Sequence, residues 1–217
     1  MTTPITNQTP VSVILPVLNE ERYLRATIDS ITTQDYPGEL EIVLALGPSR
    51  DRTNEIAAEI AKGLALKDKR IILVENSSGK TADALNCAIA ASTFPIIVRV
   101  DGHSLLPPGY INEAVATLSR TGAVNVGGVM AAEGVTGFER AVAAAMRSKF
   151  GVGGASFHVG GTEGARDTVY LGVFLRSAIA EIGGFDPHFI RAQDWELNFR
   201  LRERGGLIYF NPKLQVK

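Results

Sequence analysis

Several features that would restrict this protein to a particular class are scarce in its sequence. Of the 217 residues one is cysteine, which excludes an intramolecular disulfide framework and any CxxC motif. No uninterrupted apolar run reaches the roughly 18 residues of a membrane-spanning helix, and no secretory signal is evident. A single cysteine is compatible with a reducing compartment, so we expect a cytoplasmic protein.

An excess of charge of either sign is also absent. Lysine and arginine together number 22, aspartate and glutamate number 23, and the formal net charge is −1. No overall field therefore attracts nucleic acid or an anionic membrane, and we expect no nucleic-acid partner. An anionic ligand would need a local device, such as a metal ion, a helix N-terminus or a few placed cations.

Length and composition fit an ordinary globular protein. Hydrophobic residues make up 45% and charged residues 21% of the chain, and its length suits one domain or two small ones. We find neither a repeat nor a linker. The polar, proline-bearing segment 1–10 predicts a flexible tail. We expect a single domain over 11–217, with one half at 11–103 and the other at 104–217.

The first half of the chain alternates strand and helix patterns. Four short, continuously apolar runs predict buried strands at 11–16, 40–46, 70–75 and 94–100. A helical pattern follows each of the first three, and Asn19 is the candidate cap of the first helix, with Asp51 or Thr53 for the second. Continuous apolar runs are typical of a parallel sheet covered on both faces. The sequence therefore predicts an α/β fold with a doubly wound core.

The second half of the chain is less regular. Further helices and strands are expected at 107–120, 123–132, 136–147, 168–176, 177–186, 193–206 and 207–210. The glycine-rich stretch 148–167 predicts a long loop, and we consider it a flap that could close on a ligand. The chain stops soon after the last expected strand with no capping element, which we interpret as a missing C-terminal extension.

The fourth apolar run ends in the stretch "RVDGHS", residues 99–104. In an extended segment, residues two apart point the same way, so Asp101 and His103 can act together. A carboxylate and an imidazole can hold Mn²⁺ or Mg²⁺, and the imidazole favours Mn²⁺. Such an ion could bind a diphosphate. The alternative is that Asp101 caps the next segment and His103 is a surface residue.

Other nucleotide-binding motifs are not matched. The stretch "SSGKT" imitates a phosphate-binding P-loop, but Val74 stands where that motif needs its first glycine. The first strand is followed by "PVLNEE", which has neither the GxGxxG of a dinucleotide-binding dehydrogenase nor the glycine-rich, arginine-bearing loop of a sugar-1-phosphate nucleotidyltransferase. These classes are disfavoured.

Several motifs occur in an order that is specific as a set. They are "VSVILPVLNEERYLRATIDSI", "GKTADALNCAI", "RVDGHS", "YLGVFLRSAIAEIGGFD" and "QDWELNFRLRERGG". From Val11 to Phe210 the chain thereby resembles the family-two inverting nucleotide-sugar glycosyltransferases, and within them bacterial exopolysaccharide glucosyltransferases of the succinoglycan type. The resemblance implies the A-type glycosyltransferase fold. This is a Rossmann-like, mostly parallel sheet flanked by helices, with a smaller mixed sheet on the acceptor side.

The resemblance implies a donor site around the fourth strand end. Family members carry Asp-x-Asp there, so Asp101 takes the role of metal and donor ligand, and His103 stands at the second acid. Gly102, between these two residues, is implied to contact the donor. Lys80 is implied to reach the donor from the third strand end, although a solvated lysine is an equal alternative. Arg99 either pairs with Asp101 or supports the diphosphate.

The first and second loops are implied to hold the nucleobase, with uridine favoured. Pro16, Leu18, Asn19 and Glu20 would flank the base. Relatives have acids in the second loop where this chain has Leu46 and Gly47. The Gly47 backbone or the Glu20 carboxylate would then read the base, unless the second loop is an ordinary turn.

Inverting transfer needs a carboxylate that removes a proton from the acceptor hydroxyl. The resemblance places this base at Asp194, at a helix N-terminus whose dipole would keep the acid ionised. The alternative is a plain N-cap. Trp195 would stack on an acceptor sugar or pack its own helix, and Asp186 would fix the turn before Pro187.

The implied reaction moves a hexose, with glucose favoured, from a UDP-sugar to a hydroxyl of a glycan or lipid-linked saccharide. Peripheral association with the inner face of the plasma membrane is compatible with such an acceptor. The alternative is a catalytically impaired nucleotide-binding or scaffold protein with the same fold, which the departures at Leu46, Gly47 and His103 support. Asp194 favours turnover, because a binding protein does not need a base.

Overall fold

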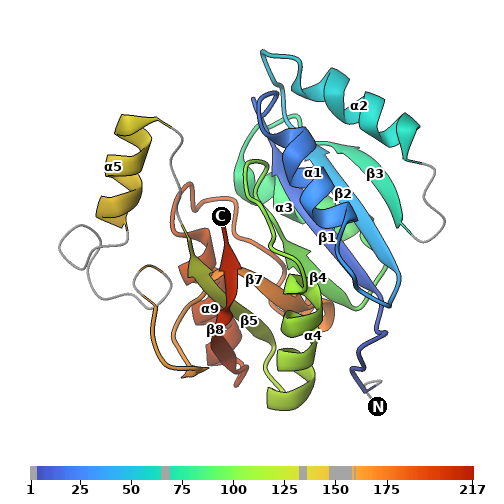
Figure 1. Cartoon of the computed structure of the whole chain (residues 1–217). Helices are drawn as coiled ribbons and strands as arrows, with labels where there is room; N and C mark the ends of the chain where they lie inside the picture. Colours follow the sequence, from blue (N-terminus) through green and yellow to red (C-terminus); the bar gives the residue numbers. More distant parts are fainter. Residues whose placement is uncertain (1–3, 65–68, 132–135, 147–157, 159) are drawn as a thin grey trace.

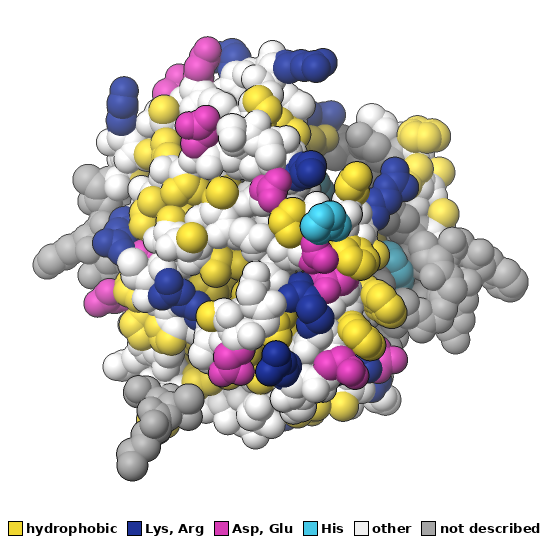
Figure 2. Space-filling view, turned by 180° about the vertical axis from the view of Figure 1, so that it is seen from behind, with side chains coloured by type: hydrophobic (Ala, Val, Ile, Leu, Met, Phe, Trp, Pro, Cys, Tyr) yellow, Lys and Arg dark blue, Asp and Glu magenta, His cyan; other side chains and the backbone are white. Residues whose placement is uncertain are grey.

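The computed structural model describes residues 4–64, 69–131, 136–146, 158 and 160–217. Its centre is one eight-stranded sheet in the order β3-β2-β1-β4-β7-β5-β8-β6 (Figure 1). Acidic and basic side chains are interspersed over the face that Figure 2 shows, in keeping with the balanced net charge.

The first half of the sheet is parallel, as the sequence predicts. Its strands are β1 (Val11–Val17), β2 (Leu40–Leu46), β3 (Lys69–Glu75) and β4 (Ile96–Arg99). All four residues of β4 are buried, and β1 and β2 are buried almost throughout. This burial on both faces explains their continuous apolar pattern.

Helices cover both faces of this sheet. One face packs against α1 (Leu24–Thr32), α2 (Thr53–Gly63) and α4 (Tyr110–Thr121). The other face packs against α3 (Thr81–Ala91), α8 (Arg176–Glu181) and α9 (Gln193–Glu203). The carboxyl ends of the parallel strands stay uncovered by these layers, and ligands of such folds bind at that edge.

The structure corrects the predicted start of the first helix. Asn19 does not cap it, because α1 begins only at Leu24. Asn19 takes a left-handed conformation (φ 57°), and its side chain is used by a neighbouring loop. At the start of α2, the Asp51 carboxylate accepts a hydrogen bond from Thr53 N–H at 3.0 Å. The N-cap of α2 is Arg52, so neither predicted cap stands at that position, but Asp51 satisfies the N–H of the first helical residue.

The second half of the chain extends the same sheet rather than forming a separate smaller one. Strand β7 (Tyr170–Leu175) pairs antiparallel with β4 and with β5 (Asn125–Met130). Strand β8 (Ile208–Val216) then pairs parallel with β5. This half is mixed, as expected, and Asp194 in the first turn of α9 reaches Arg99 at the carboxyl end of β4. Helix α5 (Gly137–Met146) lies at the far side of this half.

The structure changes two predictions for the second half of the chain, the end of the last strand and the extent of the loop at 148–167. The last strand runs to Val216, beyond the expected 207–210, because its second part pairs again with β5 after a register shift. Lys217 also exchanges two backbone hydrogen bonds with Leu105. Within the expected loop 148–167, Gly164–Ala165 forms the short strand β6 against β8. The flap hypothesis concerns mainly 147–157 and 159, which lie outside the described residues.

The described part of the expected tail is attached to the core. Ile5 packs against the main hydrophobic cluster, and its carbonyl accepts a hydrogen bond from the Ser119 hydroxyl at 2.9 Å. The Thr9 carbonyl accepts a second one from the Tyr36 hydroxyl. Residues 4–10 are therefore held by contacts that their polar composition does not indicate.

Candidate functional site

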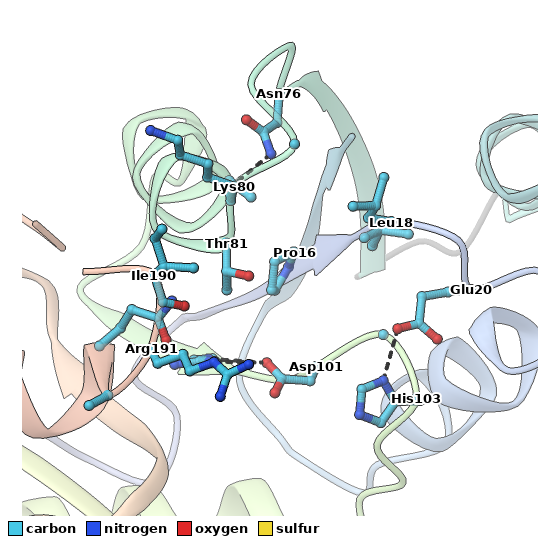
Figure 3. Close-up of a pocket in the computed structure, with 17 residues that line it drawn as sticks. Pro16, Leu18, Glu20, Asn76, Lys80, Thr81, Asp101, His103, Ile190 and Arg191 are labelled. Atoms are coloured by element: carbon cyan, nitrogen blue, oxygen red, sulfur yellow. Dashed lines mark hydrogen bonds and ion pairs between the residues drawn. The ribbon is translucent and has the colours of Figure 1, made fainter. Parts of the chain in front are cut away.

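A cavity of about 490 Å³ opens at the carboxyl ends of β1 and β4. Of the predicted donor residues, it is lined by Pro16, Leu18, Glu20, Lys80, Asp101, Gly102 and His103. In Figure 3, Leu18, Glu20 and His103 lie on one side and Lys80 on the other, with Asp101 on the floor. Four segments far apart in the sequence thus meet where a parallel sheet binds its ligands.

The floor of the cavity holds a buried arginine between two acids. Arg99 is 6% exposed at the end of β4. Its Nε and a terminal nitrogen each lie 3.1 Å from Asp101 Oδ1, and its other terminal nitrogen donates to Asp194 Oδ1. Burial opposes the charge of Arg99, but the two carboxylates outweigh it and raise the pKa of the guanidinium. The predicted pairing of Arg99 with Asp101 is confirmed.

Asp194 reaches this cluster from the first turn of α9. It is not the N-cap, which is Ala192, so the plain-cap alternative does not hold. The Asp194 side chain is 26% exposed, and it stands next to Gln193 and Arg99, which both line the cavity. Burial raises the pKa of the Asp194 carboxyl, and Arg99 offsets only part of that effect. Desolvation of the Asp194 carboxyl therefore acts against the helix dipole, which favours the ionised acid.

His103 and Glu20 form a polar pair on one wall. His103 Nδ1 lies 2.8 Å from Glu20 Oε1, a contact drawn in Figure 3. This hydrogen bond raises the pKa of His103. The backbone of Gly102 passes so close that an added Cβ would lie 2.8 Å from Glu20 Cγ. A side chain at 102 would therefore displace Glu20 from its contact with His103.

The donor set suits a divalent ion that a ligand helps to hold. Within the described ranges, no cluster of three His, Cys, Asp or Glu side chains could bind a metal ion alone. With the hydrogen on Nδ1 given to Glu20, His103 presents Nε2, an arrangement common among metal-ligating histidines. Asp101 adds a carboxylate. Divalent ions in such sites are often bound by one or two protein ligands together with substrate phosphates.

Asn19 and Gly47 do not line this cavity; they hold two loops together. Asn19 N–H donates to Ser49 Oγ at 3.1 Å, and its side chain accepts from Arg50 N–H at 2.8 Å. Glu20 N–H donates to Thr53 Oγ1 at 2.7 Å. These bonds fix the loop that carries Leu18 and Glu20. They explain why polar residues follow the first strand.

Gly47 lines a second cavity of about 310 Å³ beside the first. Its N–H donates to the Val17 carbonyl at 2.8 Å, and its own carbonyl accepts from Ser49 N–H and from the Asn54 side chain. The Gly47 backbone is thus satisfied within the protein. Of the two predicted base-reading groups, Glu20 lines the main cavity and Gly47 does not.

Sequence reasoning missed one wall of the main cavity. It is lined by Ile190, Arg191 and Ala192 from the loop before α9 and by Gln193, the first residue of that helix. Ile190 is 78% exposed, and Ala192 takes a left-handed conformation (φ 59°). Alanine carries no signal for that conformation, which favours glycine or asparagine. Nothing in this short polar and apolar mixture could have marked the segment as a wall.

Trp195 lies outside the cavity on the exposed side of α9. It is 53% exposed and stacks on Phe199, with ring centroids 6.0 Å apart and planes 15° from parallel. This position fits both predicted roles of Trp195, stacking on an acceptor sugar and packing its own helix, because a stacked pair can still present a free ring face.

Asp186 accepts a hydrogen bond from His188 N–H at 2.9 Å, so its predicted role in the turn is confirmed.

Comparison with known sequences gives the family. The sequence model described as "Glycosyl transferase family 2" matches residues 12–182. The succinoglycan biosynthesis protein ExoA of Rhizobium meliloti is 29% identical over 94% of this chain and 61% of its own length. A dolichyl N-acetyl-α-D-glucosaminyl phosphate 3-β-D-2,3-diacetamido-2,3-dideoxy-β-D-glucuronosyltransferase of Methanococcus voltae is 27% identical over 94% of this chain and 65% of its own length. The chain therefore spans somewhat less than two thirds of these relatives.

Comparison with solved structures agrees on the fold. A mannosyltransferase from Pyrobaculum calidifontis, in complex with GDP-Man and Mn²⁺, superposes with a TM-score of 0.72 at 23% identity. The match covers 99% of this chain and 58% of that one. TarS of S. aureus (1–349) in complex with UDP-GlcNAc gives 0.65 at 16% identity, over 93% and 58% of the two chains. The predicted A-type glycosyltransferase fold is confirmed, and the chain belongs to glycosyl transferase family 2.

Proposed function

We propose that this protein is an inverting glycosyltransferase that moves a hexose, with glucose favoured, from a nucleotide diphosphate to an acceptor hydroxyl. One observation carries the proposal. A single cavity gathers Asp101 and His103 on its floor and wall, and Arg99, which lines the same cavity, pairs with the carboxylate of Asp194. An anion-binding end and a proton acceptor are thereby adjacent.

The donor would lie across the cavity. Asp101 and His103 would hold a divalent ion, Mn²⁺ in preference to Mg²⁺ because of the imidazole, which neutralises the charge of the diphosphate. Pro16 and Leu18 would contact the base, for which we favour uracil. Lys80, at the start of α3, would add a positive charge from the opposite side of the cavity. The solved relatives whose titles name GDP-Man with Mn²⁺ and UDP-GlcNAc support a nucleotide-sugar donor.

Asp194 would act as the general base. The acceptor hydroxyl oxygen forms a bond to the anomeric carbon from the face opposite the diphosphate. The bond to the diphosphate oxygen breaks, and the nucleoside diphosphate leaves with the electron pair. Asp194 takes the hydroxyl proton during this single displacement, which inverts the anomeric centre. A carboxyl whose pKa burial raises is a better proton acceptor, when ionised, than an ordinary aspartate.

The acceptor would be a glycan or lipid-linked saccharide, with Trp195 as a platform for a sugar ring. The names of the sequence relatives, a succinoglycan biosynthesis protein and a dolichyl-phosphate sugar transferase, support such acceptors and a role in bacterial exopolysaccharide synthesis. In the described part of the chain, no helix has the length and apolarity to cross a bilayer. We propose a cytoplasmic location with peripheral contact at the inner face of the plasma membrane.

Isothermal titration tests the donor site. UDP and GDP are each titrated with and without Mn²⁺ into the wild type and Asp101→Ala. We expect UDP binding that needs both Mn²⁺ and Asp101. UDP-sugars are then screened for release of UDP, with Asp194→Asn as the turnover control. If neither nucleotide binds under any condition, the proposal fails and the scaffold alternative takes its place.

A further inference from the structure

Arg99 links the proposed donor site at Asp101 to the proposed base, Asp194, by pairing with both carboxylates. It ends β4, a strand buried on both faces, and its guanidinium lies 5.9 Å from the centre of the Phe185 ring. Among ion pairs between described residues, Asp101 and Asp194 each pair with Arg99 alone. One cation therefore holds two acids that come from segments 93 residues apart (194 − 101).

The rigid, planar guanidinium of Arg99 fixes the directions in which it can bind the two carboxylates. A guanidinium presents five N–H donors in a rigid planar fork and stays protonated in proteins. Here one edge of the fork, Nε with a terminal nitrogen, faces Asp101, and the remaining terminal nitrogen donates to Asp194. Because the fork is rigid and buried, fixing it on Asp101 also fixes where the Asp194 carboxylate can lie.

We propose that Arg99 is a positioning residue that places the base, Asp194, relative to the donor site at Asp101. This inference rests on the proposed function. Arg99 acts through Asp194 and not on the substrate, so loss of its fork should lower the rate of the chemical step more than it weakens nucleotide binding. A misplacement of about 1 Å in a reacting group can cost roughly 10²-fold in rate.

The test compares Arg99→Lys with a matched variant, Arg70→Lys. Lysine keeps the charge but lacks the fork. Arg70 also binds a buried acid, Glu41, and lies over a phenylalanine ring, Phe94, yet it stands at the opposite, amino-terminal end of the strands. The double variant Arg99→Lys/Asp194→Asn completes the set. For each protein we measure UDP release from the sugar donor that the wild type uses, and binding of UDP with Mn²⁺.

We expect kcat of Arg99→Lys to fall about 10²-fold and the Kd of UDP with Mn²⁺ to change by a smaller factor, because lysine keeps a positive charge beside Asp101 but lacks the fork that also reaches Asp194. Arg70→Lys should keep wild-type kcat. The double variant should be no slower than Asp194→Asn, because Arg99 has no further effect once its target has lost its function.

Three results overturn the inference. Arg99→Lys could turn over like the wild type, its defect could be entirely in UDP binding, or the two substitutions could multiply in the double variant. In each of these cases the wild type still transfers sugar, so the proposed function stands. If the wild type neither binds nucleotide nor releases UDP, the proposed function fails, and the inference fails with it because no base remains to be positioned.

Discussion

The two ends of the parallel sheet each hold an acid paired with an arginine, but the two acids are surrounded differently. At the amino-terminal end, Glu41 is fully buried and accepts hydrogen bonds from the Ser12 hydroxyl and the Thr93 N–H, both at 2.6 Å. Arg70 adds two more. Burial alone would raise the pKa of Glu41, but these bonds outweigh it and hold the pKa below its ordinary value.

At the carboxyl-terminal end, Asp194 is partly exposed and accepts from Arg99, which it shares with Asp101. Burial raises the pKa of the Asp194 carboxyl by more than the charge and hydrogen bond of Arg99 lower it. The comparison teaches that an acid saturated with hydrogen bonds stabilises a fold. An acid with few partners at the edge of a cavity retains its capacity to take a proton, and such perturbed groups gather at functional sites.

Asp194→Asn should separate the two ends most strongly. Removing the proposed base should lower sugar transfer by about 10³-fold. Stability should be unchanged or higher at neutral pH. The reason is that a raised folded pKa contributes stability only at low pH, and this contribution is lost as the pH rises through that pKa. UDP release and thermal melting measure the two effects. Full activity in the variant would remove Asp194 from the mechanism.

Glu41→Gln should have the opposite profile. Breaking a buried, hydrogen-bonded charge should lower the free energy of unfolding by about 3 kcal/mol, while kcat of the folded protein stays the same. Denaturant titration and UDP release check these outcomes. Glu59→Gln, at an exposed pair with Arg25, is the control and should change stability by less than about 1 kcal/mol. A loss of kcat in Glu41→Gln would show that the two ends are not independent.

Lowering the pH should stop activity before it removes the contribution of Glu41 to the fold. Asp194 must be ionised to accept a proton, and its raised pKa places that loss above the ordinary aspartate value of about 4. The stability from Glu41 is present above the ordinary glutamate value of about 4.3 and fades as the pH falls through its lowered folded pKa. Rate and unfolding profiles of the wild type and Glu41→Gln test this order. Coincident loss of rate and stability in the wild type would contradict it.

Gly102→Ala should have the smallest effect and tests the wall beside the proposed metal ligands, Asp101 and His103. The new Cβ would lie 2.8 Å from Glu20 Cγ, so Glu20 must move away from His103. We expect the Kd of UDP with Mn²⁺ to rise by about fivefold, equivalent to roughly 1 kcal/mol, by titration calorimetry. Gly63→Ala, where an added Cβ meets nothing within 4 Å, is the control. Equal affinities in both variants would remove the Glu20–His103 pair from the site.

The parallel half of the fold was predictable because a strand buried on both faces needs an unbroken apolar run, as in β1, β2 and β4. The true start of the first helix was not predictable, because the Asn19 side chain accepts a hydrogen bond from the backbone N–H of Arg50 instead of capping the helix. The second part of β8 also escaped prediction, since its polar residues pair through the backbone.

For the site, local spacing pointed to Asp101 and His103, and family resemblance to Asp194. The connection of Asp101 to Asp194 through Arg99 depends on packing α9 against β4, which no local pattern encodes. The same packing desolvates Asp194, and for this reason its pKa moves opposite to the helix-dipole expectation. The wall at 190–193 depends on a left-handed alanine for which the sequence has no signal.

The most direct test of the account is the change in melting temperature on adding UDP with Mn²⁺ to the wild type, Asp101→Ala and Glu41→Gln. A ligand that binds the folded state raises its stability by mass action. We predict a rise in the wild type, an equal rise from a lower starting temperature in Glu41→Gln, and no rise in Asp101→Ala. A rise that survives Asp101→Ala, or one that Glu41→Gln abolishes, would contradict the assignment of ligand binding to the carboxyl end of the sheet.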